Sequence, residues 1–545
     1  MLTRLAGGRV IDPAHRRDGV GDIWMRDGRI VEAPPGGAAA HATYDVSGKI
    51  VMAGGIDIHS HIAGSNVNTA RLLMPEHHRV SPVRSDKISP LSVASSAVAT
   101  GSLYAAMGFT TVVEPAVAPH HALHAHLELA DIPIIDKATL AVLGNDDFLL
   151  GLMHQRESAS AVRDYVGWTL DTSRALGVKV INAGGAVAFK ANVRAFALDD
   201  IVPFYGVSSR QIVKTLQRAV HELGVPHPLH VHCNNLGLAG SAETALATVA
   251  AAEDWPLHLA HLQFYGYGRA GERGFSSDAA RLAQAVNAAK NVTVDVGQVM
   301  FGQTVTISSD VLRQFNARNN ARPKKWVIFD GDANGGGIVP YNYRANDFYN
   351  AIQWAVGLEL FLLIDDPWRV FFTTDHPNGA PFTTYPDILA LLMDRNLRAQ
   401  WIAELPPQAM ALTTLPSISR EYTLSEIATM TRAAPARLLG LADRGHLGVG
   451  AIADVAVYAD DADKAAMFRS AALVFKNGEL VVRDGEVTAR HWGQALVVRT
   501  ERDRTIDRRM RDYYDDRYGL SPEFMAVPEN AIGRADPFEF VPCVT

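Results

Sequence analysis

Short apolar segments alternate with Ala-rich or Leu-rich stretches between residues 53 and 430. The clearest of these segments read GFTTVVEP, GVKVINAGG, PLHVHCNN, PLHLAHLQF, NVTVDVG, KWVIFDG and RVFFTTDHP. Continuous apolar runs separated by helix-length stretches are typical of parallel strands covered by helices. A parallel sheet in a segment of this length, with room for insertions, predicts an α/β fold whose strands close into a (β/α)₈ TIM-like barrel.

The two flanks of this region both consist of short strand-like runs separated by turn signals. Residues 1–52 contain GRVIDP, DIWMRDGRIVEA and YDVSGKIVM, and residues 431–496 contain AIADVAVYA, ALVFKNGELVV and RDGEVTA. Hairpin signals occur in both flanks, at Asp27-Gly28, Asn477-Gly478 and Asp484-Gly485. We therefore expect the flanks to pair into one small β-sandwich domain beside a catalytic barrel of residues 53–430.

Residues 497–545 form a tail of dense mixed charge. Its first part, RTERDRTIDRRMRDYYDDRYGLSPEF, is rich in arginine, aspartate and tyrosine and has no core pattern. Such a segment is either a solvated helix and tail or an arm that packs on a partner subunit. The sequence leaves both alternatives open.

Composition excludes several classes of partner and location. The formal charge of −7 over 545 residues is modest, so we expect no general attraction to nucleic acid or to an anionic membrane. Only Cys233 and Cys543 occur, which excludes a disulfide framework and a cluster held by four cysteines of this chain. The first residues lack the apolar core of a signal peptide, so a cytoplasmic location is expected.

An uncharged run at residues 91–113 has the length of a membrane span. However, Ser, Thr and Gly interrupt it, and Gly108 introduces the β-branched segment FTTVVE. We therefore expect a helix followed by a strand, and no membrane association.

Two histidines one residue apart stand in GGIDIHSHIAG, after an apolar stretch. If the preceding KIVMAGGIDI is a strand, alternate side chains point to the same face, so His59 and His61 can reach one metal ion. His-x-His pairs also occur at solvated strand ends. The pair therefore needs support from the rest of the chain.

Four further residues of ligand type lie on or at the end of later apolar segments. They are Lys179, His232, His261 and Asp375. Active sites of parallel barrels lie at the carboxyl ends of the strands, so these side chains are expected to meet the histidine pair. The set predicts one metal-dependent catalytic centre.

Lys179 is an unusual residue for this position because a closed barrel has no edge strand where an amine can remain solvated. An ammonium group has no lone pair for a metal. A neutral lysine that captures carbon dioxide becomes a carbamate, whose two oxygens can bridge two ions. We expect this modification at Lys179, with Lys190 in the following loop as the fallback.

Neighbouring histidines offer alternatives to two of the predicted ligands. His230 shares a face with His232, and the strand-end rule favours His232 and makes His230 a deeper neighbour. His258 and His261 would lie on opposite faces, and His261 is again closer to the strand end. Both choices predict the residue nearer the rim.

Asp375 stands in TDHPNG, where an aspartate commonly forms an N-cap or an Asx turn. Its position at the end of the last strong apolar segment instead fits a carboxylate that ligates metal and shuttles a proton. We therefore predict Asp375 as the catalytic residue.

Other conspicuous residues are given structural roles. The run Gly335-Gly336-Gly337 lacks the context of a phosphate loop and is expected to form a tight turn beside the substrate, without a cofactor. Six histidines lack strand-end placement and are expected to be structural or solvated: His77, His78, His120, His121, His124 and His126.

The ordered set resembles the amidohydrolase superfamily. That pattern has His-x-His on the first strand, a carboxylated lysine on the fourth, histidines on the fifth and sixth, and an aspartate on the eighth. Five stretches are further similar to the A subunits of formylmethanofuran dehydrogenase and of the bacterial formyltransferase/hydrolase complex: HIAGSNVNTARLLMPEHHR, HVHCNNLG, HLQFYGYG, GGGIVPYNYR and TTDHPNGAPF. The Ala- and Arg-rich composition is more similar to that of the bacterial complex.

The resemblance implies a binuclear metal amidohydrolase that releases formate from a formylated furan-type one-carbon carrier, in company with other subunits. It implies two divalent ions, zinc by ligand type, with one on His59 and His61, one on His232 and His261, and carboxylated Lys179 between them. Asp375 would transfer the proton. Loop residues after the strands are expected to contact the substrate, namely Asn66, Gln263, Tyr265 and Asn378.

Three alternatives to this function remain open at this stage. The same site could condense formate with the amine, as in formylmethanofuran dehydrogenase, or hydrolyse a cyclic amide, as hydantoinases and dihydroorotases do. A scaffold that has lost the chemistry is the third alternative. Retention of all six ligand types disfavours the scaffold.

Overall fold

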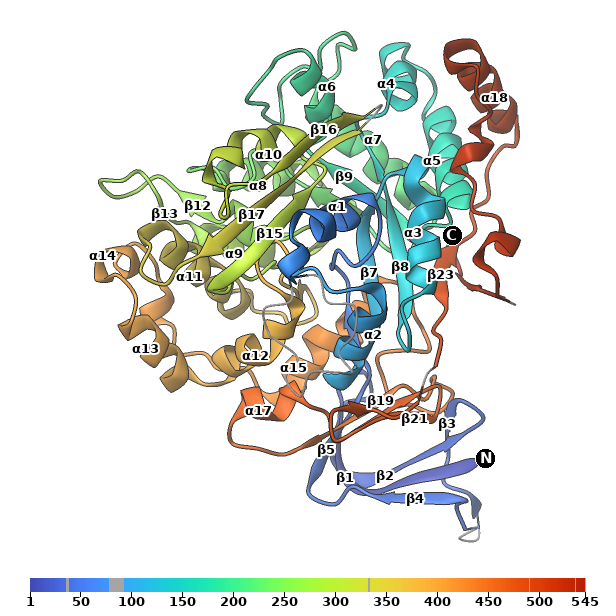
Figure 1. The fold of residues 1–545 in the computed structure, drawn as a ribbon, viewed down its shortest axis with the longest axis vertical. Coiled ribbons are helices and arrows are strands. Elements are labelled where there is room, and N and C mark those ends of the chain that lie inside the picture. The colour runs from blue at the N-terminus through green and yellow to red at the C-terminus, as the bar shows by residue number, and fades with distance from the viewer. Residues whose placement is uncertain (36–38, 78–92, 332–333, 490, 535, 545) are drawn as a thin grey trace.

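A computed structural model describes residues 1–35, 39–77, 93–331, 334–489, 491–534 and 536–544. A parallel barrel occupies most of the molecule, and a mainly antiparallel sheet built from the flanks lies at one end of it (Figure 1). These two parts confirm the predicted fold class.

Eight parallel strands surround the barrel axis, and each pairs with the next in chain order. A parallel bridge between Ser60 and His376 brings the ends of the first and last strands together. The strands are β6 (Gly55–Asp57), β7 (Phe109–Val117), β8 (Asp136–Leu143), β9 (Gly177–Ile181), β10 (Leu229–His232), β11 (Leu257–Leu259), β14 (Val292–Asp295) and β18 (Val370–Phe371).

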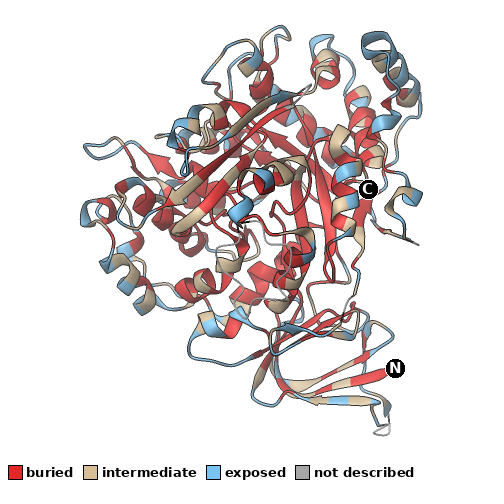
Figure 2. Ribbon diagram, in the orientation of Figure 1, coloured by how far each residue is buried: buried red, intermediate tan, exposed pale blue. Residues whose placement is uncertain are grey.

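The barrel strands are almost wholly buried because helices cover them, as Figure 2 shows. All eight residues of β8 are buried, for example. The covering helices are α2 (Ala97–Ala106), α3 (Ala122–Ala130), α5 (Ala159–Ser173), α7 (Ser209–Glu222), α8 (Ala242–Ala251), α9 (Ala279–Ala288), α11 (Phe348–Leu363) and α12 (Tyr385–Met393).

Shorter elements occupy the connections. The short helices are α1 (Ser65–Leu73), α4 (Asp147–His154), α6 (Gly185–Lys190), α13 (Arg395–Ala403), α14 (Pro407–Met410), α15 (Leu424–Ala428), α16 (Ala434–Leu438) and α17 (Lys464–Arg469). A small hairpin joins β12 (Tyr267–Gly268) to β13 (Ser276–Ser277).

The flanks pair into one nine-stranded sheet with a core of its own, which includes Leu5, Val51, Val455 and Phe475. Strand β5 of the N-terminal flank pairs with β19 of the C-terminal flank, as predicted. The nine strands are β1 (Leu2–Asp12), β2 (Arg17–Arg26), β3 (Arg29–Val31), β4 (Ala42–Asp45), β5 (Lys49–Ala53), β19 (Val455–Ala459), β20 (Leu473–Lys476), β21 (Glu479–Arg483) and β22 (Glu486–Val487).

Three points of the strand prediction were wrong. The segment KWVIFDG does not enter the barrel but forms β16 of a separate three-stranded sheet. The third barrel strand, β8, was missed because its first residues, Asp136 and Lys137, are charged, although both are buried. In addition, KIVMAGGIDI is not one strand: it divides into β5 of the flank sheet and β6 of the barrel.

The C-terminal end of the chain extends the barrel sheet. Strand β23 (Ala495–Val498) pairs with β8, and β24 (Phe538–Val541) pairs with β23, both in parallel. Between them α18 (Thr505–Tyr518) lies on the outside, where its buried residues are Ile506 and Met510 (Figure 1). The tail thus combines a largely solvated helix with a strand that adds to the barrel sheet.

A three-stranded sheet with one helix is inserted between β14 and α11, and we call it the roof. It contains β15 (Gly302–Ser308), α10 (Val311–Ala317), β16 (Val327–Gly331) and β17 (Asn334–Tyr343). The run Gly335-Gly336-Gly337 is part of β17, so the predicted turn is wrong. A Cβ atom on Gly337 would lie 2.5 Å from Cβ of Gln314, so glycine permits α10 to approach the strand.

The uncharged run near residue 100 forms α2 followed by β7, as predicted. None of the helices in the described ranges combines the length and the apolar character needed to cross a bilayer.

Candidate metal centre

His59, His61 and Asp375 meet at the carboxyl ends of the first and last barrel strands. The Nε2 atoms of His59 and His61 lie 3.1 and 3.3 Å from Oδ1 of Asp375. Both histidines follow β6 directly, so the short strand brings both rings to the rim. The three side chains could hold one metal ion together.

Lys179 lies in the middle of β9, and its Nζ atom is 3.0 Å from Nε2 of His59. The residue is only 2% exposed. Burial lowers the pKa of this amine to about 8, although the carboxylate of Asp375 opposes the shift. A neutral amine is therefore accessible near physiological pH. Lys190 ends α6, away from this cluster, with its Nζ atom 3.6 Å from Asp330.

His232 ends β10 and His261 follows β11, and their ring centroids are 4.7 Å apart. Both rings line one cavity together with Lys179 and Asp375. The structure therefore places all six predicted ligands at one rim. Burial lowers the pKa of both imidazoles, so these rings are neutral and can offer a lone pair.

The two neighbouring histidines lie deeper in the barrel. His230 places Nε2 3.0 Å from Nδ1 of His59, and His258 places Nε2 3.1 Å from Asp295. The prediction that His258 and His261 point to opposite faces was wrong, because the strand ends at Leu259 and His261 adopts φ +34°. Beyond the strand, side chains no longer alternate, and both rings turn inward.

Two buried carboxylates behind the histidine pair were missed by the sequence analysis. Oδ2 of Asp295 lies 3.0 Å from Nδ1 of His59, and Oε1 of Glu114 lies 2.9 Å from Nδ1 of His61. A carboxylate on one ring nitrogen fixes the tautomer and leaves the other nitrogen available for a metal. Glu114 lies in β7 and Asp295 ends β14, so the strand-end rule could have found Asp295.

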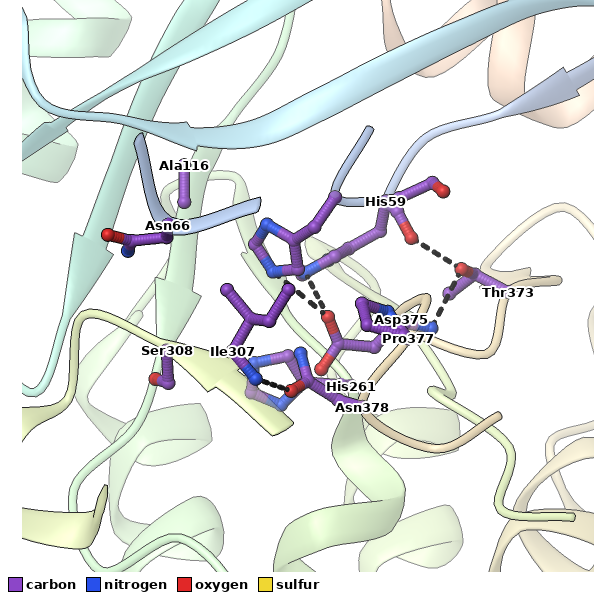
Figure 3. Close-up of polar contacts among 12 residues, drawn as sticks. His59, Asn66, Ala116, His261, Ile307, Ser308, Thr373, Asp375, Pro377 and Asn378 are labelled. Carbon is purple, nitrogen blue, oxygen red and sulfur yellow. Dashed lines mark hydrogen bonds and ion pairs between the residues drawn. The ribbon is translucent and has the colours of Figure 1, made fainter. Parts of the chain in front are cut away.

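Asp375 does not cap a helix. Its backbone amide donates to Oγ1 of Thr373 at 3.0 Å, and that hydroxyl donates to the carbonyl of His59 at 2.6 Å (Figure 3). These bonds hold the backbone at φ +51°. Burial would raise the pKa of Asp375, but His59 and His261 lower it well below its usual value. The side chain is thus an ionised carboxylate that faces imidazoles.

The cluster fits a divalent cation. Nδ1 of His261 is buried without a hydrogen-bond partner among the described residues, and Oδ1 of Asp375 faces two imidazole nitrogens but forms no well-aligned hydrogen bond. Buried polar atoms normally have partners, so such atoms call for an explanation such as an ion. Imidazole and carboxylate are a donor set that suits zinc.

A cavity of about 290 Å³ lies between the roof and five of the six predicted ligands, all but His59. Part of its wall is aromatic, with Phe264, Phe275, Tyr341, Tyr343 and Tyr349. The cavity thus joins ligand-type side chains to aromatic side chains, which can pack against a flat ring, and to polar residues of the roof such as Arg313 and Gln314.

Asn66 and Asn378, two of the four residues predicted to contact the substrate, line this cavity. Oδ1 of Asn378 accepts the backbone amide of Ile307 at 2.6 Å, and Figure 3 shows this contact between the barrel rim and the roof. Gln263 and Tyr265 do not line it. The amide of Gln263 donates to the carbonyl of Gln353, and the hydroxyl of Tyr265 donates to the carbonyl of Cys233.

Of the six histidines that were given structural roles, the five that the structure describes lie outside the ligand cluster. His121, His124 and His126 contact Ser65, Asn68 and the carbonyl of Ser173. His120 and His121 line a neighbouring cavity of about 210 Å³. His77 ends a short 3₁₀ turn, and His78 lies outside the described residues.

Comparison with known proteins agrees with this geometry. The model of the amidohydrolase family matches residues 42–489. The chain is 52% identical to the A subunit of the formyltransferase/hydrolase complex Fhc of Methylorubrum extorquens, over the full length of both. It is 36% identical to protein FwdA of Methanocaldococcus jannaschii, with 84% of this chain and 83% of the relative covered.

A solved structure is also similar over its whole length. It is the crystal structure of the FhcABCD complex from Methylorubrum extorquens with methylofuran. One chain of that complex matches the present chain with a TM-score of 0.96 at 52% identity, and 100% of both chains is covered. The chain described here therefore belongs to the amidohydrolase family, in the group that contains the A subunit of the formyltransferase/hydrolase complex.

Proposed function

We propose that this chain hydrolyses the N-formyl group of a furan-type one-carbon carrier, such as a formylated methylofuran, to formate and the free amine. The observation that supports this most directly is the meeting of six ligand-type side chains beside a cavity with an aromatic wall. The full-length similarity to one chain of a complex that was crystallised with methylofuran supports the choice of carrier. We also propose that the chain works as the corresponding member of such a multi-subunit complex.

The proposed centre would hold two zinc ions, one on His59 and His61 and the other on His232 and His261, with a carbamate on Lys179 as a further ligand. When bound, such ions polarise a carbonyl as Lewis acids and lower the pKa of water. Asp375 completes the ligand set.

Asp375 performs the proton transfer in this proposal. Its ionised carboxylate accepts a proton from the attacking water and delivers it to the nitrogen of the departing amine. The C–N bond of the formamide breaks, the water oxygen remains on the carbon, and formate leaves. This transfer is needed because an amine anion is a poor leaving group.

The cavity orients the carrier. The aromatic wall would pack against the furan-bearing end, while Asn66 and Asn378 lie near the ligand end, where a formamide must be held.

The test is formate release from formyl-methylofuran by the full-length chain with its metal content measured in parallel. We expect two divalent ions per chain and formate formation, and no comparable hydrolysis of hydantoin or dihydroorotate. Asp366→Asn, in the loop before β18, is the matched control, because Asp366 is half-exposed and pairs with Arg369. A fully metal-loaded chain that releases no formate, or that prefers the cyclic amides, would refute the proposal.

A further inference from the structure

Asp310 lies outside the predicted ligand set, yet its carboxylate meets one of the ligands. Oδ2 of Asp310 is 3.3 Å from Nε2 of His232, and both residues are buried. Asp310 precedes α10, so it belongs to the roof and not to a barrel strand. This contact joins the roof to the metal centre.

The other oxygen of Asp310 is already occupied. Oδ1 accepts the backbone amide of Arg313 at 3.0 Å, as the N-cap of α10, and the side-chain amide of Asn182 at 3.0 Å. Asn182 is itself held, because its Oδ1 atom accepts from Nδ2 of Asn234 at 2.8 Å. With Oδ1 fixed by two donors, Oδ2 is the oxygen directed at His232.

The same pairing occurs at two other predicted ligands. Asp295 and Glu114 each lie on Nδ1 of a histidine whose Nε2 atom faces Asp375. In His232 the carboxylate lies on Nε2 instead. A proton shared between Nε2 and Asp310 leaves Nδ1 as the nitrogen with a lone pair.

We propose that Asp310 is a positioning residue that fixes His232 as a metal ligand through Nδ1 and thereby couples the roof to the second cation. The inference rests on the dimetal centre proposed above. Because the carboxylate and the N-cap of α10 belong to one residue, seating of the roof and binding of this cation stabilise each other. Such coupling is reciprocal by thermodynamic linkage.

The substitution Asp310→Asn tests the tautomer directly. The amide oxygen would remain on Arg313 and Asn182, which both donate, so the NH₂ group would face Nε2 of His232. That arrangement favours a proton on Nδ1 and removes the proposed lone pair. We expect the affinity for the second cation to fall by about 10- to 100-fold.

Asp146→Asn is the matched control. Asp146 is the N-cap of α4, where Oδ1 accepts from the amide of Leu149 and the hydroxyl of Tyr165, and no hydrogen bond to a histidine is described for it. Full-length chains are titrated with Zn²⁺ against a chelator and with Co²⁺, whose visible absorption reports the geometry of the ligands. We expect two ions in wild type and in the control, and one tightly bound ion with an altered Co²⁺ spectrum in Asp310→Asn.

Hydrogen exchange provides a second measurement, whose first part needs only the wild type. Peptides that cover residues 302–317 should gain protection when metal is added to the metal-free wild type, and Asp310→Asn should lose this gain.

The outcomes separate the two proposals. Asp310→Asn with wild-type affinity and spectrum, an equal loss in Asp146→Asn, or unchanged exchange of the wild-type roof would overturn the role of Asp310 and leave the dimetal centre intact. A wild type that binds fewer than two ions would overturn the centre itself, and this role with it.

Discussion

His59 turns its Nδ1 atom to Asp295, whose Oδ2 atom lies 3.0 Å away although the residues are 236 positions apart in the chain. The first and seventh barrel strands bring them together, and neither side chain is exposed to solvent. An ionised carboxylate can only accept a hydrogen bond, so it favours the tautomer with the proton on Nδ1 and the lone pair of Nε2 on the side of Asp375. Asp295, which lies on a strand that carries no predicted ligand, thus favours the tautomer in which His59 can bind a metal.

The substitution Asp295→Asn should weaken metal binding. The new amide can present its NH₂ group to Nδ1 of His59 and so favour the wrong tautomer, and we expect an affinity loss of about 10- to 100-fold. Competition with a chelator measures it. Glu359→Gln is the control, because Glu359 is a buried carboxylate that accepts bonds from Thr414 and Leu415, far from the imidazoles. Equal losses in both variants would count against a specific role for Asp295.

The substitution Asp375→Asn should lower kcat by about 10²- to 10⁴-fold, since an amide cannot accept the proton of the attacking water. Because Asp375 is also a predicted ligand, the rate has to be expressed per metal-loaded chain, with the ion content measured on the same sample. The control is again Asp366→Asn. If loaded Asp375→Asn deformylates the carrier at the wild-type rate, another group transfers the proton.

Carbon dioxide should be required to rebuild the centre. Metal-free wild type should recover two ions and full activity with zinc plus bicarbonate, and only part of this with zinc under carbon dioxide exclusion. Lys179→Met should bind about one ion under either condition, because no carbamate can form between the two positions. Lys190→Met, which alters the exposed lysine near Asp330, should behave as wild type. Bicarbonate-independent recovery of the wild type would argue against the modification.

The sequence predicted the barrel and the six converging residues because both follow from short-range patterns. Apolar runs show where strands are, and ligand-type residues at their ends show which rim is functional. The partners of those residues were less visible. Asp295 could be found from its place at a strand end, whereas Glu114 lies within β7, and only the folded chain shows which histidine each one contacts.

Errors in the sequence-based interpretation have local physical causes. Strand β8 was missed because it begins with Asp136 and Lys137, and charged residues are expected at the surface. Asp136 is buried because it pairs with Lys476, which comes from a distant segment of the chain. The roof strand β16 has the apolar content of a barrel strand, and only its antiparallel pairing with β17 separates it. Asp310 could not be linked to His232 from sequence because the roof folds back over the rim.

Asp136 should make the protein acid-sensitive. Burial alone would raise its pKa, but Lys476 and Arg444 lower it well below the usual value. A depressed carboxyl pKa stabilises the fold above the unfolded value of about 4, and this stability is lost as pH falls toward the folded value. Asp136→Asn should therefore cost about 3 kcal/mol at pH 7, where it leaves buried cations less compensated.

Urea unfolding at a series of pH values measures this effect. The wild type should lose stability below pH ~4, while Asp136→Asn should show a flatter profile there. Asp18→Asn is the control, because Asp18 forms an exposed pair with Arg9 and should contribute less than about 1 kcal/mol. Parallel acid profiles for wild type and Asp136→Asn would show that the buried network is not responsible.

Two helical glycines should respond in opposite directions to alanine. A Cβ atom on Gly101 of α2 would lie 2.1 Å from the carbonyl oxygen of Pro133, a backbone atom that cannot move without displacing the start of β8. Gly151 of α4 has nothing within 4 Å of that position. Since alanine favours helix by about 1 kcal/mol over glycine, Gly151→Ala should raise the unfolding midpoint. Gly101→Ala should lower the midpoint, because overpacking costs about 1 to 3 kcal/mol of unfolding free energy, more than the gain in helix propensity. A stabilised Gly101→Ala would mean that α2 does not pack this closely on the barrel.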